Sequence, residues 1–354
     1  EPPMDEVQSI IDLFSNGQIN EAVIEIDLLI KKYPSAPLLF NISGAFHKSN
    51  GQLDKAVIKF KQALNLKPNY AEAHYNLGVT LRELGQIDAA IQSYQNAIAI
   101  KNDYPNAHNN LGNALLDLKR FDAAVEHFEW AVAFNTEFAS AYNNLGIANR
   151  LRGNILEAIK SFDKALAIKP DYAEAANYRG IIFQDTGDHT NALKYYQKAL
   201  AINPNLADVY NNIGLTEKEI NNPENAIKSF EKALSINPNF ANGYYNLCGF
   251  EQYSLDNKKI AKMQSLLSSD ETNQSDRINL NFALAKTNET LENQDEFFSY
   301  LHEGNRLRKI ELGYSIKKSQ DLFSTISEIF AKEPSSINES SLNITSSKRP
   351  LFIL

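Results

Sequence analysis

The sequence contains one cysteine, Cys248, and no long apolar run. A single cysteine can neither close an internal disulfide nor build a cysteine-based zinc site. This favours a reducing compartment, and we expect a cytoplasmic protein, although a chain without disulfides could also be exported. No apolar stretch approaches the ~18 residues that a membrane span needs. The chain begins at Glu1 and ends on the apolar Leu354, so we expect both ends to continue in a longer protein.

Positive charge is also scarce. Lys and Arg total 35 and Asp and Glu total 43, which gives a formal net charge of −8. A mildly acidic chain without a basic block lacks the charge that binding to a nucleic-acid phosphate backbone requires. We therefore expect neither nucleic acid nor a membrane as the partner.

Catalytic motifs are missing as well. The sequence has no HExxH, GxxxxGK[ST] or GxSxG pattern, and its six histidines do not show metal-ligand spacing. Acidic and basic residues are common, but we expect them on solvated helix faces. These residues form no catalytic, cofactor-binding or metal-binding constellation.

A period of 34 residues organises most of the chain. Alanine recurs at this interval at Ala22, Ala56, Ala90, Ala124, Ala158, Ala192 and Ala226. A small residue usually lies twelve positions before each alanine, a bulky residue four positions after it, and a second small residue seven positions after it. Such a period indicates stacked helical repeats rather than an ordinary helical bundle.

One repeat, residues 71–104, shows the physical meaning of this spacing. Four residues occupy one face of a first helix and three occupy one face of a second: His74, Leu77, Gly78 and Leu81, then Ala90, Tyr94 and Ala97. Gly85 separates the two helices. The small residues let the helix backbones approach closely, and the aromatic residue fills the remaining gap. A single pair cannot bury its apolar faces alone, so neighbouring pairs must stack.

The pattern resembles the tetratricopeptide repeat. This resemblance implies an all-α fold, a right-handed superhelix of paired helices, over residues 3–270. Seven repeats cover residues 3–240 and begin at Pro3, Pro37, Ala71, Pro105, Ala139, Ala173 and Ala207, and a degenerate eighth covers 241–270. Cys248 stands in the small-residue column of this eighth unit, so we expect a packed structural thiol. Below, "position" means the place within a repeat, counted from these starting residues.

Asparagine is concentrated on the first helices. If positions 4, 7, 8 and 11 face the core, positions 2, 5, 9, 12 and 13 face away from it and position 6 lies at the edge. We call these six positions the first-helix face; family resemblance makes it the lining of a concave groove. Nine asparagines at positions 5 and 6 are our candidate peptide-binding residues: Asn76, Asn109, Asn110, Asn143, Asn144, Asn177, Asn211, Asn212 and Asn246.

A row of amides offers donors and acceptors at regular intervals, which suits the main chain of an extended peptide. It resembles the asparagine ladder in the repeats of the O-linked N-acetylglucosamine transferase. The alternative is that these asparagines are surface residues that only cap local backbone. A carboxylate-binding clamp is disfavoured, because Glu83 and Glu219 stand beside the basic residues Arg82 and Lys218 at position 12.

The 34-residue register fails beyond Leu255. We expect a short helix near 260–267, within the degenerate eighth unit, and then a helical connector over residues 271–332, with helices near 276–291, 296–312 and 319–330. A polar, serine-rich linker follows at 333–347. Residues 348–354, KRPLFIL, have the pattern of a buried strand.

This order of segments resembles bacterial proteins in which tetratricopeptide repeats precede a sulfotransferase domain. In that family the connector commonly carries a stretch similar to residues 301–308, LHEGNRLR, and a strand similar to residues 348–354. The resemblance implies a catalytic domain beyond Leu354 that binds 3′-phosphoadenosine 5′-phosphosulfate (PAPS), so no cofactor is expected within this chain.

The sequence therefore predicts a protein- or peptide-binding scaffold that presents a polypeptide to a sulfotransferase domain absent from the chain. Two alternatives stay open: a stand-alone adaptor for complex assembly, and the repeat region of a glycosyltransferase. The peptide ligand and the oligomeric state are not predicted.

Overall fold

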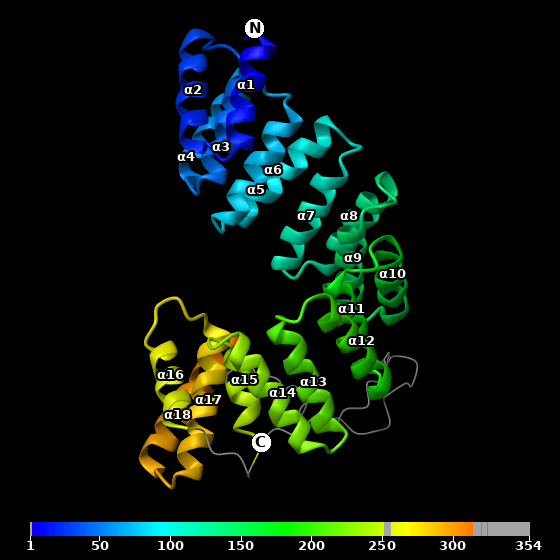
Figure 1. Cartoon of the computed structure of the whole chain (residues 1–354), viewed down its shortest axis with the longest axis vertical. Coiled ribbons are helices and arrows are strands. Elements are labelled where there is room, and N and C mark those ends of the chain that lie inside the picture. Colours follow the sequence, from blue (N-terminus) through cyan, green and yellow to red (C-terminus); the bar gives the residue numbers. More distant parts are fainter. Residues whose placement is uncertain (1, 251–255, 314–319, 321–323, 325–354) are drawn as a thin grey trace. The chain divides into compact units, whose positions relative to one another are not determined.

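The computed structural model describes residues 2–250 and 256–313, together with residues 320 and 324. Within these residues the regular structure is helical throughout and contains no strand (Figure 1). The expected all-α fold of paired helices is therefore confirmed. Residues 251–255 of the eighth repeat, nearly all of the helix expected at 319–330, the linker at 333–347 and the strand at 348–354 lie outside the described residues.

The chain divides into two compact units, Glu1–Asn222 and Pro223–Leu354. The first unit contains α1 Met4–Ser15, α2 Ile19–Lys32, α3 Pro37–Ser49, α4 Leu53–Leu66, α5 Ala71–Glu83, α6 Ile87–Ile100, α7 Pro105–Asp117, α8 Phe121–Phe134, α9 Ala139–Leu151, α10 Ile155–Ile168, α11 Ala173–Asp185, α12 His189–Ile202 and α13 Ala207–Glu219. The second contains α14 Pro223–Ile236, α15 Ala241–Leu247, α16 Asn257–Leu267, α17 Gln274–Thr290 and α18 Gln294–Glu311. The division falls between the two helices of the seventh repeat, inside the array expected to run to residue 270.

Each turn within a repeat depends on position 15, which takes a positive φ angle. Glycine fills it in five repeats of the first unit, with φ between 71° and 83°, as at Gly85 and Gly153. Lys119 and Asn221 adopt the same conformation at φ 57° and 59°. Side chains with a Cβ atom disfavour this region, asparagine less than lysine. The turn geometry is therefore imposed by the packing of the two helices rather than by the residue itself.

Each helix pair is held by contact between the small residue at position 8 and the aromatic ring at position 24. A Cβ atom built on Gly112 would lie 2.6 Å from Cε1 of Phe128. The same short approach, 2.5–2.7 Å, recurs in four other repeats, at Gly44, Gly78, Gly146 and Gly180. The rings are fully or almost fully buried. The packing expected from the sequence, a ring filling the space that a glycine leaves, is therefore present.

The two helix layers of the first unit differ in how closely their members approach. Successive first helices contact one another directly from α3 to α13, whereas successive second helices do so at most marginally. Neighbouring repeats also pack second helix against first helix, as α4 does on α5 and α6 on α7. The first-helix face is therefore the closely spaced side of the layer, where side chains of adjacent repeats can meet.

In the second unit, α17 occupies the centre. It packs against α15, α16 and α18, and its buried residues cover more than half of its circumference, whereas Lys286 and Glu289 are exposed. Gly304 is the buried residue of α18, and a Cβ atom there would lie 3.0 Å from Cε1 of Phe282 on α17. The Cys248 thiol is buried, and its sulfur lies 3.4 Å from Oγ1 of Thr287. Cys248 is thus a packed thiol, as its column predicted.

We predict that Gly112→Ala destabilises the protein by about 1–3 kcal/mol, because the ring of Phe128 must move to admit a methyl group. Urea unfolding followed by circular dichroism measures the loss. Gly112→Ala/Phe128→Leu should recover part of it, since the smaller side chain vacates the space. Additive losses in the double variant would contradict the role given to the ring.

We predict that Lys119→Gly raises the thermal unfolding midpoint, since glycine relieves a left-handed lysine whose conformation costs roughly 1 kcal/mol. Asn221→Gly is the matched control at the same position of another repeat. It should give a smaller rise, because asparagine tolerates this conformation better. An equal response of the two variants would mean that φ strain is not what distinguishes them.

Candidate functional site

The candidate asparagines form hydrogen-bonded pairs that join consecutive repeats. Nδ2 of Asn76 donates to Oδ1 of Asn41, Nδ2 of Asn144 to Oδ1 of Asn109, and Nδ2 of Asn212 to Oδ1 of Asn177, each over 3.0 Å. In every case position 6 donates to position 5 of the preceding repeat. The row is therefore part of the contact between first helices as well as part of their surface.

Two steps of the row use tyrosine. Where Tyr75 stands at position 5, Nδ2 of Asn110 donates to its hydroxyl over 3.1 Å. Where Tyr178 stands at position 6, it stacks on Phe162 with the ring centroids 5.5 Å apart. The preceding Asn143 is fully buried, and its amide has no hydrogen-bond partner among the described residues. The row is thus interrupted between α9 and α11.

Burial separates the two columns of candidates. At position 5, Asn109, Asn143 and Asn211 are buried, and Asn177 is half-buried. At position 6 the candidates, Asn76, Asn110, Asn144, Asn212 and Asn246, are half-buried. Asn246 belongs to α15 of the second unit, whereas the other eight candidates belong to the first. A ligand on this face can therefore reach the position 6 amides, while position 5 mainly supports them.

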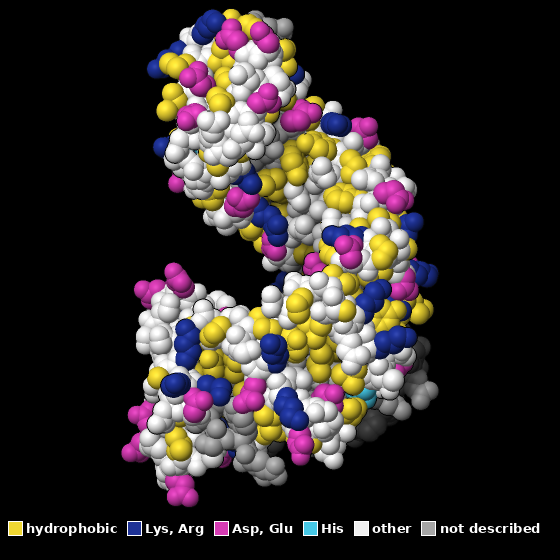
Figure 2. Space-filling view, viewed as in Figure 1, with side chains coloured by type: hydrophobic (Ala, Val, Ile, Leu, Met, Phe, Trp, Pro, Cys, Tyr) yellow, Lys and Arg dark blue, Asp and Glu magenta, His cyan; other side chains and the backbone are white. Residues whose placement is uncertain are grey.

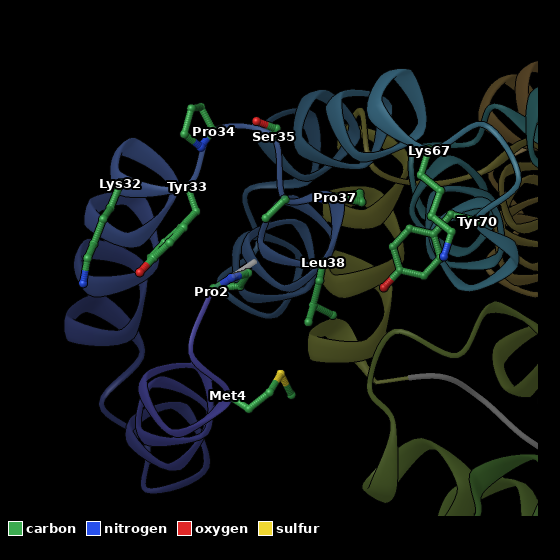
Figure 3. Close-up of a pocket in the computed structure, with 11 residues that line it drawn as sticks. Pro2, Met4, Lys32, Tyr33, Pro34, Ser35, Pro37, Leu38, Lys67 and Tyr70 are labelled. Atoms are coloured by element: carbon green, nitrogen blue, oxygen red, sulfur yellow. The ribbon is translucent and has the colours of Figure 1, made fainter.

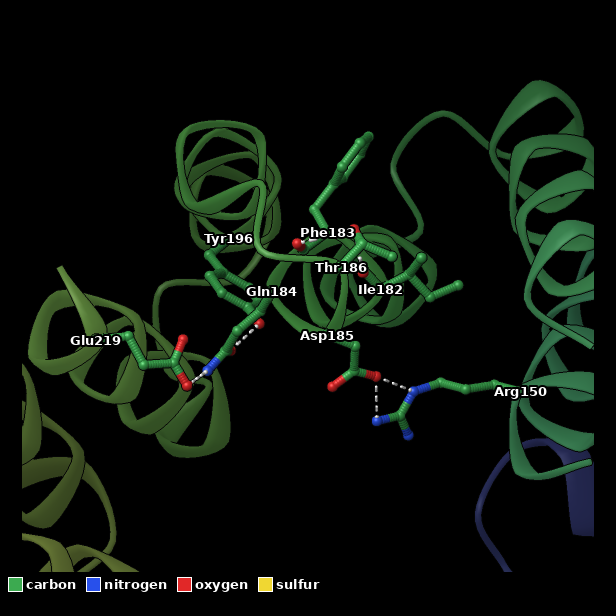
Figure 4. Close-up of polar contacts among 8 residues, drawn as sticks. All are labelled: Arg150, Ile182, Phe183, Gln184, Asp185, Thr186, Tyr196 and Glu219. Carbon is green, nitrogen blue, oxygen red and sulfur yellow. Dashed lines mark hydrogen bonds and ion pairs between the residues drawn. The ribbon is translucent and has the colours of Figure 1, made fainter. Parts of the chain in front are cut away.

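A second row joins the C-terminal ends of the first helices through charge. The basic residue at position 12 binds the acidic residue at position 13 of the next repeat: Lys48 to Glu83 at 2.7 Å, Arg82 to Asp117 at 2.9 Å, and Arg150 to Asp185 at 2.7 Å. Gln184 continues the pattern, since its Nε2 donates to Glu219 over 3.2 Å while its Oε1 accepts from the Tyr196 hydroxyl (Figure 4). These cations are neutralised within the chain, which argues further against a carboxylate clamp.

The row of ion pairs is visible in the sequence as a regular interval between opposite charges. Opposite charges stand 35 residues apart, one residue more than the period, at Lys48 and Glu83 and at Arg82 and Asp117. In Figure 2 basic and acidic side chains are interspersed over the visible surface, and hydrophobic side chains are exposed between them. The row therefore produces no large area of positive charge on that view.

The histidines at position 4 close the turn that precedes their own repeat. Nε2 of His74 lies 3.0 Å from the carbonyl oxygen of Pro68, and Nε2 of His108 lies 3.2 Å from that of Asn102. The Tyr244 hydroxyl makes the same bond to Pro238. Both histidines are therefore structural donors, in keeping with the packing role expected for this column.

His108 also faces His127 of α8, with the two Nδ1 atoms 3.1 Å apart. Since Nε2–H of His108 donates to a carbonyl, Nδ1 of His108 is free to accept from His127 in the neutral pair. Burial lowers the pKa of both imidazoles below 6.5. The pair is therefore a neutral contact between α7 and α8 that acid should weaken.

A cavity of about 620 Å³ opens at the N-terminal end of the first unit (Figure 3). Met4, Tyr33, Leu38 and Tyr70 line it, together with prolines that precede α1 or lie at the connection between α2 and α3. The lining is mainly apolar and contains none of the candidate asparagines. In the described part of the chain, no three His, Cys, Asp or Glu side chains could share a metal ion. No helix there is both long and apolar enough for a bilayer crossing.

Family models match the repeat region. A model described as TPR repeat matches residues 47–81 and 78–119, and models described as tetratricopeptide repeat match residues 105–138, 137–203 and 171–239. Together these matches extend from residue 47 to residue 239, more than half of the chain. No curated protein matches the sequence.

Solved structures of repeat proteins resemble the fold. A tetratricopeptide repeat protein from Parabacteroides merdae is 20% identical, with a TM-score of 0.54, and the match covers 66% of this chain and 93% of that one. PilW, a type IV pilus biogenesis factor, is 21% identical, with a TM-score of 0.53, and the match covers 58% and 94%. PilF of Pseudomonas aeruginosa is 19% identical, with a TM-score of 0.52, and the match covers 59% and 95%. These similarities concern the fold alone.

We predict that stability falls as the pH decreases below about 6.5, because the unfolded imidazoles then bind protons that the folded pair excludes. Above that pH both states are neutral and the effect vanishes. His108→Tyr should flatten the pH dependence between pH 5 and 7 while keeping a donor for the turn carbonyl, as Tyr244 does. The exposed His302→Gln is the control. Equal pH dependence of the wild type and His108→Tyr would refute the assignment.

Proposed function

Since the chain belongs to the tetratricopeptide repeat family, we propose that it is a protein-interaction scaffold that binds an extended polypeptide on the first-helix face of its first unit. The observation that carries this proposal is the row of amides that bridges consecutive first helices. We expect the scaffold to act in the cytoplasm, in keeping with its single cysteine.

The pairing leaves part of each amide available. Each asparagine amide has two N–H donors and one carbonyl acceptor. In the Asn144–Asn109 pair, one N–H of Asn144 is used, and its other N–H and its Oδ1 have no partner among the described residues, so a ligand can use them. The bond to Asn109 also fixes the orientation of this half-buried side chain. A fixed donor and acceptor lose little conformational entropy on binding.

The apolar part of a ligand has a matching surface. Position 9 of the first helices carries Val79, Ile147, Ile181 and Leu215, which are half-buried. These side chains alternate with the amides along the same face, since positions 5, 6 and 9 lie within one helical turn of one another. A peptide can therefore place its main chain against amides and its apolar side chains against position 9.

A pair of variants tests the row. Asn144→Ala removes a ligand-facing amide, whereas Asn109→Ala breaks the same inter-repeat bond from its buried side and leaves the Asn144 amide in place. We predict that Asn144→Ala weakens binding of a fluorescent pool of extended peptides by about tenfold, roughly 1.4 kcal/mol, and that Asn109→Ala weakens it less. Fluorescence anisotropy measures both, and circular dichroism verifies folding. Equal losses would mean that the amide acts only through the repeat contact.

We further propose that the bound polypeptide is presented to a PAPS-dependent sulfotransferase domain that follows this chain in the parent protein. Support comes from the similarity of residues 301–308 to the connector of such proteins and from the order of segments. Within that stretch Gly304 packs closely against Phe282, and this contact explains why a residue without a side chain stands there. Arg306 and Arg308 pair with Glu303 and Glu311, so they are not free for an anion.

The sequence encoded directly downstream of Leu354 decides this second proposal. A turn similar to PRSGT supports a sulfotransferase. A stop codon supports the stand-alone adaptor, and a different α/β domain supports the glycosyltransferase alternative. Either of the last two outcomes removes the sulfotransferase proposal and leaves the peptide-binding proposal untouched.

A further inference from the structure

On the first-helix face of the first unit, the basic residues at position 12 form ion pairs, whereas the acidic residues at position 2 do not. The cations at position 12, Lys48, Arg82 and Arg150, each bind an acidic residue of the next repeat. The acidic residues at position 2 behave differently. Glu72, Glu174 and Asp208 are exposed, and none of them belongs to the ion pairs that the described residues form on this face. The charge that this face leaves for a ligand is therefore negative at its N-terminal edge.

All three carboxylates raise the pKa of a nearby tyrosine on or directly before a first helix. Burial raises the pKa of Tyr178, and the charges of Glu174 and Asp208 raise it further. Burial raises the pKa of Tyr104, with smaller contributions from Tyr75 and Glu72. Glu174 and Tyr178 stand four residues apart on α11 and are therefore neighbours on one helix face. A carboxylate next to a tyrosine ring attracts ammonium and guanidinium groups, through both the charge and the ring face.

The lysines that precede several first helices, and Arg150 on α9, make contacts of their own within the chain. Lys67, Lys101 and Lys169 lie over the rings of Tyr70, Tyr104 and Tyr172 at 5.0–5.2 Å from the ring centroids. They stand at position 31, in the turns between repeats rather than on the first helices. Arg150, which also acts on Tyr178, is held by two hydrogen bonds to Asp185. The position 2 carboxylates are therefore the acidic groups of the first-helix face that have no ion-pair partner among the described residues, whereas the position 13 acids are paired.

We propose that the polypeptide bound on this face is cationic, with lysine or arginine side chains directed to Glu72, Glu174 and Asp208 and apolar residues between them. This inference rests on the proposed function, since it names the chemical class of the same ligand. Charge complementarity selects this occupant over an acidic tail, which the neutralised cations of position 12 cannot hold. The half-buried residues at position 9 accept the apolar side chains.

Three matched peptides test the inference on the full chain. They share one pattern of apolar residues and carry lysine, glutamine or glutamate at the remaining places. We expect the lysine peptide to bind about tenfold more tightly than the glutamate peptide at roughly 0.05 M salt, with the glutamine peptide between them. The difference should shrink at roughly 0.5 M salt, because exposed charges are then screened.

A pair of triple variants locates the effect. Glu72→Gln/Glu174→Gln/Asp208→Asn should abolish the preference for lysine and preserve binding of the glutamine peptide. Asp54→Asn/Asp88→Asn/Glu126→Gln removes the same charge from exposed positions of the second helices and should preserve the preference. Loss of the preference in both variants would mean that net charge, not this face, selects the ligand, and the inference would be overturned.

The outcomes separate the two proposals. If all three peptides bind equally, the inference on charge is wrong and the peptide-binding proposal stands. If none of them binds while the protein is folded, the peptide-binding proposal itself is wrong, and the inference fails with it.

Discussion

The close approach of a position 8 glycine to a position 24 ring sets the geometry on which the rest of the first unit depends. A Cβ atom at Gly146 would come within 2.6 Å of Phe162, so the two helices of a repeat can take up this spacing only without one. Core packing at this density transmits small volume changes to its surroundings. Because the same contact recurs in five consecutive repeats, each first helix meets the next one at a constant spacing.

That constant spacing explains why polar contacts recur at an interval of 35 residues. Asn76 at position 6 binds Asn41 at position 5 of the preceding repeat, and Arg82 at position 12 binds Asp117 at position 13 of the next repeat. In both pairs the residue of the later repeat stands one position further along its helix, so the interval is one residue longer than the period. A position on one helix then always faces the same position on the next. The polar rows are thus a consequence of apolar packing, and they occupy the amide and guanidinium groups that an isolated repeat would offer to solvent.

Within the repeats that the structure describes, the sequence alone was sufficient for the paired helices and for the glycine–ring contact, because both follow from spacing inside one repeat. It identified the asparagine columns but not their division into a buried and a half-buried set. That division depends on how one repeat lies against the next, which the helical period does not specify. The interruption at Asn143 and Tyr178 arises in the same way, since both residues fit their own repeat and fail only as a pair.

The second unit shows that the constraint is physical rather than tied to the order of residues. There the 34-residue register is lost, yet a glycine again meets an aromatic ring across two antiparallel helices. The order is reversed, with the ring of Phe282 on the first helix and Gly304 on the second, and the approach is looser at 3.0 Å. A search for the repeat pattern misses this pair because the columns are exchanged. The same need to bring two helix backbones close together is met, and α17 carries the polar residues Asn281 and Thr287 on its buried side.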